Sequence, residues 1–200
     1  MTNKKTPHLN GSITISHEEI NDLPLRSFSG KIVLVQEASK LNRAFDEIHE
    51  HRSIGFDTET RPSFKKGELH KVSLLQIAIP DKVFLVRLNQ TGLTKHIIDF
   101  LENDSLKKAG VGIRDDIKAM QKLSRFEPGG FTELSTLAKE AGLQVESVKK
   151  LSALLLGFRI SKGAQTSNWE APTLTQKQLE YAATDAWVCL EIYKKLAKGH

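Results

Sequence analysis

The chain has 200 residues, 39% of them hydrophobic and 26% charged, which predicts one domain, or one domain with an ordered extension, and argues against wholesale disorder. Lys and Arg number 29 against 24 Asp and Glu, and the net charge of +5 slightly favours a polyanionic partner such as nucleic acid. The single cysteine, Cys189, excludes an intrachain disulfide framework and a multi-cysteine zinc site, and its apolar surroundings predict a small buried side chain.

The first 30 residues are predicted to form an N-terminal extension. Residues 1–12 are polar, which favours a loose tail, and Ser16 followed by two glutamates fits a short capped helix over 17–21. The tail lacks the apolar segment of a secretion signal, and no run of about 18 apolar residues occurs in the chain. We therefore expect no membrane contact and a soluble, cytoplasmic protein.

An alternation of strands and helices is predicted from residue 31 onward. The turn signal Pro80-Asp81 predicts an antiparallel hairpin between the third and fourth strands. Five strands are predicted from apolar runs over residues 31–35, 53–57, 71–79, 82–88 and 107–111.

Helical spacing of apolar residues continues after the strand signals have faded. The fold class is therefore predicted as α/β, with a mixed five-stranded sheet flanked by helices and a helical C-terminal half, in one domain over 31–198. The helices are predicted over residues 39–51, 91–101, 114–123, 133–141, 147–156 and 175–197.

Two acids follow the second predicted strand directly, in the segment GFDTET. Asp57 and Glu59 flank Thr58, so in an extended chain their side chains point to the same side. Like charges this close repel, and a shared proton, a basic partner or a divalent cation must offset the repulsion. Carboxylates suit Mg²⁺ and Mn²⁺, although two acids that cap a strand in a solvated loop would give the same pattern.

A second acidic stretch follows the last predicted strand, in KKAGVGIRDD over residues 107–116. Gly110 and Gly112 allow a tight turn, and Asp115 and Asp116 then open a helix. Acids in a first helical turn complement the helix dipole, which is a sufficient non-catalytic explanation for either aspartate taken alone.

A third candidate pair lies on the last predicted helix. Tyr181 and Asp185 are four residues apart and are therefore neighbours on one side of that helix. An aspartate is a poor interior helix former, and an unpaired buried carboxylate is costly. A solvated helix face for Asp185 and a core hydroxyl bonded to backbone for Tyr181 are the non-catalytic alternatives.

Taken together, the three stretches predict one carboxylate cluster made of Asp57, Glu59, Asp116 and Asp185. Four carboxylates would carry a charge of about −4, which two divalent cations would balance. Two such ions about 3.5–4 Å apart can activate water and stabilise the leaving oxygen in phosphodiester hydrolysis. None of the 7 histidines has a convincing zinc-ligand spacing, so we expect carboxylate-based metal binding.

The sequence resembles the DEDDy group of 3′–5′ exonucleases in the ribonuclease-H-like (DnaQ-like) superfamily. It is most similar to the Werner-type exonuclease domains and more distantly similar to ribonuclease D. The resemblance implies a ribonuclease-H-like fold and covers residues 30–196, with the motifs in family order. The segments that carry it are GFDTET, KVSLLQIA over 71–78, KKAGVGIRDD, SNW over 167–169, and YAATDA over 181–186.

The resemblance also implies roles for the matching residues. Asp57 would bridge two divalent cations, Mg or Mn, and Glu59 and Asp185 would bind the ion that activates water. Asp116 would hold the second ion through water, and Tyr181 would orient the attacking water. Asp115 departs from the family pattern and leaves a second aspartate as an alternative ligand, but the spacing from GVG favours Asp116.

Residues that contact nucleic acid are predicted mainly in two loops. The first covers residues 61–71, after Glu59, and the second covers residues 159–169, before the last predicted helix. Basic side chains interleaved with an aromatic ring suit a single strand, through phosphate contacts and base stacking, although an ordinary solvated loop has the same composition. Trp169, in the second loop, is predicted to pack in the core. The predicted substrate-binding residues are Thr58, Phe64, Lys65, Lys66, Arg159 and Asn168.

The resemblance, together with the predicted carboxylate cluster, implies a 3′–5′ exonuclease that acts on a single-stranded or frayed 3′ end by a two-metal-ion mechanism. DNA is the expected substrate, and RNA trimming of the ribonuclease D kind is the first alternative. A catalytically silent nucleic-acid-binding module on the same fold is the second. A basic interaction domain with its acids scattered over the surface is the third.

Overall fold

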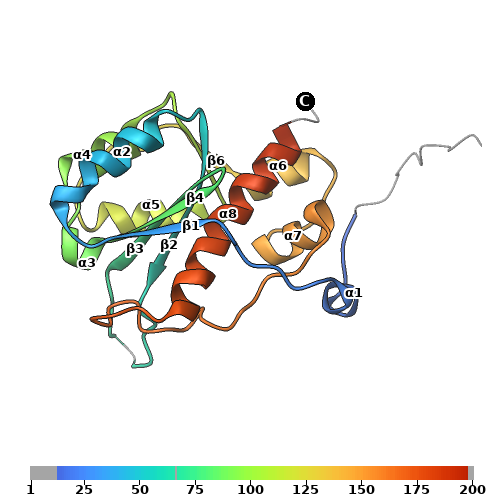
Figure 1. Cartoon of the computed structure of the whole chain (residues 1–200). Coiled ribbons are helices and arrows are strands. Elements are labelled where there is room, and N and C mark those ends of the chain that lie inside the picture. The colour runs from blue at the N-terminus through green and yellow to red at the C-terminus, as the bar shows by residue number, and fades with distance from the viewer. Residues whose placement is uncertain (1–12, 66, 198–200) are drawn as a thin grey trace, which may run out of the picture.

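A mixed sheet of six strands lies at the centre of the part of the chain that the structure, a computed structural model, describes, namely residues 13–65 and 67–197 (Figure 1). The strand order is β1-β4-β3-β2-β5-β6. Only β3 runs antiparallel to its two neighbours, and the other pairs are parallel, so the predicted hairpin is confirmed. The strands are β1 (Lys31–Val35), β2 (Ser53–Thr60), β3 (Val72–Ile79), β4 (Lys82–Arg87), β5 (Lys107–Gly110) and β6 (Phe131–Glu133).

The predicted count of five strands was wrong, because it omitted the edge strand β6. This strand has only three residues, all half-buried, which is too short for a periodic pattern in the sequence. Its position is fixed by tertiary contacts instead. The buried Lys108 amine of β5 donates to the carbonyl oxygens of Asn103 and Gly129, each at 2.7 Å, and its backbone N–H donates to Gly130. These bonds hold the loop that leads into β6 against the sheet.

The predicted helices are all present, with ends shifted by a few residues. A short turn of helix, α3 (Leu88–Thr91), precedes α4 (Lys95–Glu102), and a 3₁₀ turn (Ala38–Lys40) precedes α2 (Leu41–His49). No described helix combines the length and apolar character needed to cross a membrane. The α-helices are α1 (His17–Asp22), α2 (Leu41–His49), α3 (Leu88–Thr91), α4 (Lys95–Glu102), α5 (Ile113–Gln121), α6 (Leu134–Glu140), α7 (Val148–Leu156) and α8 (Gln176–Ala197).

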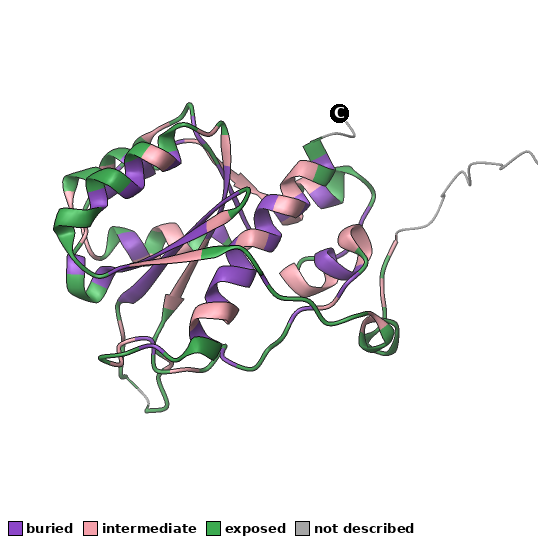
Figure 2. Ribbon diagram, in the orientation of Figure 1, coloured by how far each residue is buried: buried purple, intermediate pink, exposed green. Residues whose placement is uncertain are grey.

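The two faces of the sheet are covered by different helices. Helices α2, α4 and α5 share one apolar core with one face, whereas α8 packs on the other face (Figure 1). The far side of α8 contacts α6 and α7 in a further core, in which Cys189 is buried as predicted. Helix α8 therefore lies between two apolar layers, and its buried residues run along most of its length (Figure 2).

Helix α8 approaches β2 closely because small residues face each other there. A Cβ atom on Gly55 would collide with the carbonyl oxygen of Ala186 and would lie 2.9 Å from the backbone nitrogen of Leu190. Ala182 and Ala183 are also fully buried on this side of the helix. The distance between the acids of β2 and the aspartate of α8 thus depends on the missing side chain at Gly55.

The segment before β1 is joined to the C-terminal half of the chain. We call residues 23–28 the arm. Its backbone pairs with Arg159, with Arg26 N–H donating to Arg159 O at 2.9 Å, and Phe28 N–H donates to the Thr184 hydroxyl at 3.0 Å. The Phe28 ring also contacts Trp187, with 5.9 Å between ring centroids. The short helix predicted over 17–21 is confirmed as α1, and the predicted tail over 1–12 lies outside the described residues.

Replacing Gly55 with alanine is expected to lower the free energy of unfolding by about 3 kcal/mol, because the new methyl group meets backbone atoms that cannot move aside locally. Urea unfolding measures the loss. Gly163→Ala is the matched control, since its Cβ would meet only the Ser161 side chain, at 3.3 Å. Equal stability of the Gly55→Ala variant and the wild type would contradict the close approach.

Candidate active site

Strand β2 carries the first two acids inside the sheet rather than beyond it. The strand was predicted to end at residue 57 but continues to Thr60, with an irregularity in the ladder after Glu59. Asp57 lies opposite Gln76 and Glu59 opposite Leu74 on β3. Because side chains alternate along a strand, both carboxylates project from the face that α8 covers.

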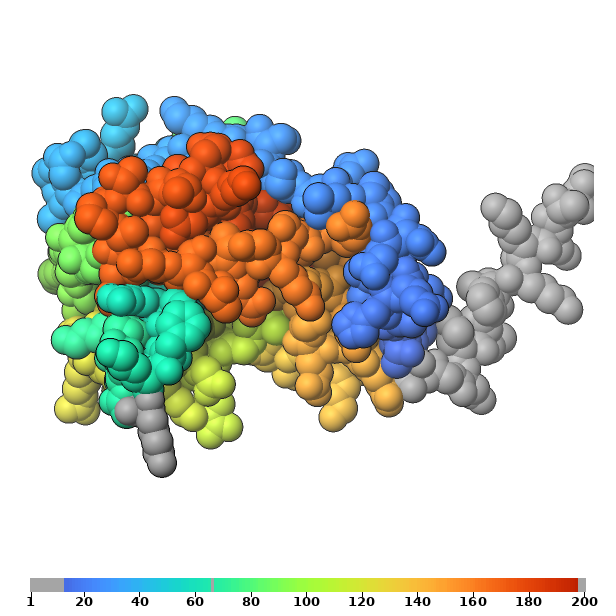
Figure 3. All heavy atoms as spheres, turned by 90° about the horizontal axis from the view of Figure 1, so that it is seen from below, coloured from blue at the N-terminus to red at the C-terminus, as the bar shows by residue number. Residues whose placement is uncertain are grey.

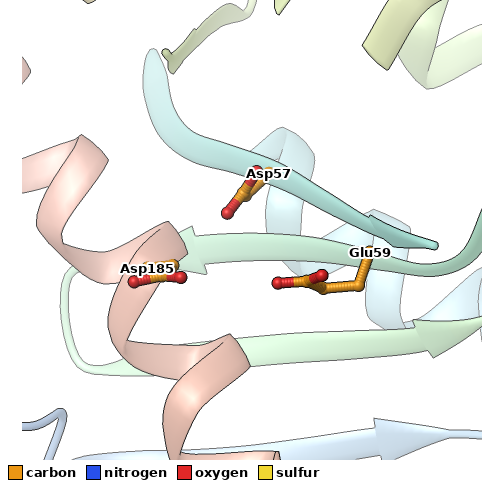
Figure 4. A group of neighbouring side chains, drawn as sticks. All are labelled: Asp57, Glu59 and Asp185. Carbon is orange, nitrogen blue, oxygen red and sulfur yellow. The ribbon is translucent and has the colours of Figure 1, made fainter. Parts of the chain in front are cut away.

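Helix α8 adds the third carboxylate. One carboxylate oxygen from each of Asp57, Glu59 and Asp185 lies within 4.8 Å of the others. Figure 4 shows the three side chains directed at a common space between β2 and α8. The sequence prediction that acids distant in the chain converge is thus met for these three.

Asp116 lies outside this group of three, on α5. Its carboxylate accepts a hydrogen bond of 2.6 Å from the Thr58 hydroxyl. Thr58 N–H in turn donates to the Asp57 carboxylate at 2.9 Å. Thr58 was predicted to contact substrate, which stays a prediction. In the structure its hydroxyl and its backbone N–H connect the acid on α5 to the acid on β2.

Asp115 is directed away from the cluster. Its side chain is 91% exposed and lies 3.9 Å from the Lys118 amine, one turn along α5. The geometry therefore favours Asp116, rather than Asp115, as the fourth acid.

Glu133 fixes the start of α5, a role that no pattern in the sequence indicated. Its carboxylate accepts hydrogen bonds from the backbone N–H groups of Gly112 and Ile113, at 2.9 and 3.0 Å. The left-handed conformation of Gly112, with a φ of 76°, directs these groups toward β6. The partner could not have been predicted, because β6 itself was missed.

Tyr181 lies one helical turn before Asp185 and is partly buried against Trp169. The two rings have centroids 6.1 Å apart, and Trp169 is fully buried, which confirms the prediction that it is a packing residue. Burial and the surrounding carboxylates raise the pKa of Tyr181 above its ordinary value, so its hydroxyl stays protonated at neutral pH.

The cluster resists ionisation when no cation is bound. Burial, followed by the charges of Asp185, Asp116 and Glu59, raises the pKa of Asp57 well above its usual range. Burial is also the largest cause for the other three acids: it raises the pKa of Glu59 to about 8 and the pKa values of Asp116 and Asp185 to about 6. Four acids with raised pKa values in one place indicate a functional site.

Lys149 on α7 provides a positive charge near the cluster that the sequence analysis did not anticipate. Its amine is buried and has no hydrogen-bond partner among the described residues. Its charge opposes the rise in the pKa of Asp185, whereas burial and Lys162 lower the pKa of Lys149 to about 8.

The residues predicted to bind substrate do not form one group. Phe64 and Lys65 are exposed on the loop between β2 and β3, with Phe64 83% exposed, and Lys66 lies outside the described residues. Arg159 is occupied by the arm, since its Nε donates to Leu23 O at 3.0 Å. Asn168 is exposed and accepts from the backbone of Glu170. Their contact with substrate stays a prediction.

The donor set fits a hard divalent cation. Three carboxylates with oxygens within 4.8 Å of one another supply only oxygen ligands, which Mg²⁺ and Mn²⁺ prefer. A bound cation would also offset the repulsion that raises the four pKa values. The number and identity of the ions do not follow from this geometry.

Comparison with known proteins decides the family. Residues 32–199 match the 3′–5′ exonuclease family. The chain belongs to the 3′–5′ exonuclease family. The resemblance that the motifs predicted is therefore confirmed at this level, while the tyrosine-containing DEDDy group stays a prediction.

Two relatives and one solved structure of the same fold illustrate the extent of the similarity. The bifunctional 3′–5′ exonuclease/ATP-dependent helicase WRN of Mus musculus is 33% identical over 186 residues, which cover 88% of this chain and 13% of that protein. A 3′–5′ exonuclease of Arabidopsis thaliana is 27% identical over 198 residues, covering 91% of this chain and 69% of that protein. The structure of Escherichia coli RNase D has the same fold, with a TM-score of 0.76 at 20% identity, covering 84% of this chain and 44% of that one.

The stability of the metal-free protein is expected to fall as pH rises from about 4 to about 8. Glu59 has a pKa near 4.5 when unfolded and about 8 when folded, so the folded state holds a proton that the unfolded state has lost. For each proton that only the folded state holds, the free energy of unfolding falls by about 1.4 kcal/mol for every unit by which the pH rises. Urea unfolding with a chelator at several pH values measures the decline.

Two additions make that measurement specific to the cluster. Excess Mg²⁺ should reverse the decline, and Asp57→Asn should flatten it, whereas Asp115→Asn, at an exposed position, should leave it unchanged. Stability that rises with pH over this range in the metal-free wild type would be the contrary result.

Thr58→Val is expected to weaken divalent-cation binding about 10- to 100-fold, because it removes the hydroxyl that holds Asp116. The pKa of Asp116 should rise above about 6, since this hydrogen bond lowers it. Cation titrations followed by thermal unfolding measure the affinity. Thr58→Ser keeps the hydroxyl and should bind the cation as the wild type does; an equal loss in both variants would show that the hydroxyl is not the cause.

Proposed function

We propose that this chain is a metal-dependent 3′–5′ exonuclease that hydrolyses phosphodiester bonds at the 3′ end of nucleic acid. One observation carries the proposal: the oxygens of Asp57, Glu59 and Asp185 lie within 4.8 Å of one another in a chain of the 3′–5′ exonuclease family. The proposed catalytic domain covers residues 31–198. The cytoplasm is its proposed location, and this part of the proposal rests on the amino-acid sequence alone.

The proposed mechanism uses two divalent cations, Mg²⁺ or Mn²⁺. Asp57, Glu59 and Asp185 would hold one, and Asp57 with Asp116 would hold the other. When bound, such a pair of ions lowers the pKa of water and neutralises the charge that develops on the scissile phosphate. The residues contribute a rigid frame, because β2 and α8 fix three of the carboxylates without loop segments.

Tyr181 is proposed to orient the attacking water. Its raised pKa keeps the phenol neutral, so the hydroxyl can hydrogen-bond to a water molecule but does not act as a base at neutral pH. Trp169 packs against the ring and limits its movement. A silent binding module would have no use for this arrangement or for four acids that repel one another.

DNA is proposed as the substrate because the motifs are most similar to those of Werner-type domains. RNA is the alternative. The structurally similar E. coli protein is described as an exoribonuclease involved in structured RNA processing, so the fold is also compatible with RNA. A single-stranded or frayed 3′ end suits the exposed Phe64 and Lys65 near the end of β2, which offer a ring for stacking and a charge for phosphate.

Degradation of 5′-labelled DNA and RNA oligonucleotides of one sequence tests the function. With Mg²⁺ or Mn²⁺ the wild type should give a ladder that shortens from the 3′ end, and Asp57→Ala should abolish it. Asp116→Asn should lose at least about 100-fold in rate, since a ligand is removed, whereas the neighbouring Asp115→Asn should keep wild-type activity. No degradation of either polymer with either metal would overturn the proposal.

A further inference from the structure

A cavity of about 470 Å³ opens beside the candidate active site. Tyr181 and Asp185 form part of its lining, together with residues of the loop before α8. The arm supplies the opposite part of the lining through Leu25, Arg26 and Ser27. We call it the arm pocket. Its volume is in the range of pockets that bind small organic ligands.

The arm is held in place on both sides of this pocket. The backbone N–H of Arg26 donates to the carbonyl oxygen of Arg159 at 2.9 Å. The backbone N–H of Arg159 donates in return to the carbonyl oxygen of Pro24 at 3.0 Å. Phe28 N–H donates to the hydroxyl of Thr184, the residue before Asp185. In Figure 3 the blue N-terminal segment lies against the orange segment that precedes α8. The arm is therefore a fixed wall of the site and lies outside the residues 32–199 that match the family.

Two positive charges line the arm pocket without an ion pair among the described residues. The Arg26 guanidinium lies 5.8 Å from the centre of the Phe158 ring, a contact that leaves its N–H groups available. Lys177, in the first turn of α8, is exposed. The acid Glu180 also lines the pocket, and its carboxylate accepts a hydrogen bond of 2.8 Å from Gln176.

A second cavity, of about 340 Å³, continues from the arm pocket. The two share Gly163, Ala164 and Lys177, and the second is lined further by Asn168 and by residues up to Gln178. Two adjoining hollows with Lys177 in common suit a chain of nucleotides better than a single nucleotide.

We propose that the arm pocket binds phosphate groups of the substrate strand next to the nucleotide that is removed, with Arg26 and Lys177 as the phosphate contacts. The proposal rests on the proposed exonuclease function, because it takes Asp185 as the place of the scissile bond. Phosphate is the ligand chemistry that an available guanidinium and an ammonium at the edge of an acidic cluster recognise. The strand is chosen over the released nucleotide because of the adjoining cavity.

Arg26→Ala and Lys177→Ala test the contacts in two ways. The affinity of Asp57→Asn protein for a radiolabelled oligothymidylate should fall about tenfold with either second substitution, and the slope of log affinity against log salt should decrease by about 0.7 for each. In the active protein the weaker substrate binding should appear mainly as a higher KM, with kcat little changed. Binding is measured on the inactive background, so it is read independently of catalysis.

Matched variants separate charge from structure. Arg43→Ala, on α2 at the opposite face of the sheet, should leave affinity and salt slope unchanged. Glu180→Gln removes the opposing charge and should increase affinity, and Arg26→Lys should retain most of it. Opposite effects of Arg26→Ala and Glu180→Gln would not arise from a disturbed arm.

The outcomes distinguish this inference from the proposed function. If the wild type degrades oligonucleotides but Arg26→Ala and Lys177→Ala keep wild-type affinity, KM and salt slope, the phosphate contacts are refuted and the exonuclease stands. If these variants instead weaken only inhibition by thymidine monophosphate, the pocket takes the released nucleotide and the strand assignment is overturned. If no oligonucleotide is degraded under any metal, the proposed function itself fails.

Discussion

The repulsion among buried carboxylates is the constraint on which the rest of this structure depends. Asp57, Glu59 and Asp185 are held with oxygens within 4.8 Å of one another, and a fourth acid lies close enough to raise the pKa of Asp57 further. Folding alone gives no reason for this arrangement, because each buried charge costs free energy. A site of this kind is retained when its unfavourable charge is what binds the cation, and the surrounding fold must supply the stability that the site lacks.

That stability comes from the packing of α8 between two apolar layers. Its alanines face the sheet, and its other side contacts α6 and α7. The helix can lie this close to β2 only because residue 55 is glycine. The same contact that buries apolar surface therefore also sets the separation between Asp57 and Asp185, so stability and site geometry are not independent in this protein.

The sequence predicted the fold class and the identity of the clustered acids, because these depend on local patterns and on motif order. It did not predict β6, which is held by the buried Lys108 amine, or the support that Glu133 gives to α5. Thr58 and Arg159 were predicted to contact substrate because they lie within or near motifs, and that contact stays a prediction. Their hydrogen bonds to Asp116 and Leu23 depend on which elements meet in space, which spacing along the chain does not reveal.

The two tryptophans of the chain lie in two different parts of the structure. Trp169 packs against Tyr181 in the candidate active site, whereas Trp187 is stacked on Phe158, with 5.6 Å between ring centroids, and contacts Phe28 of the arm. Each indole is thus an intrinsic fluorophore for one part of the molecule. A Trp→Phe substitution at either position leaves a single emission signal, which reports on the surroundings of Tyr181 in one case and on docking of the arm in the other.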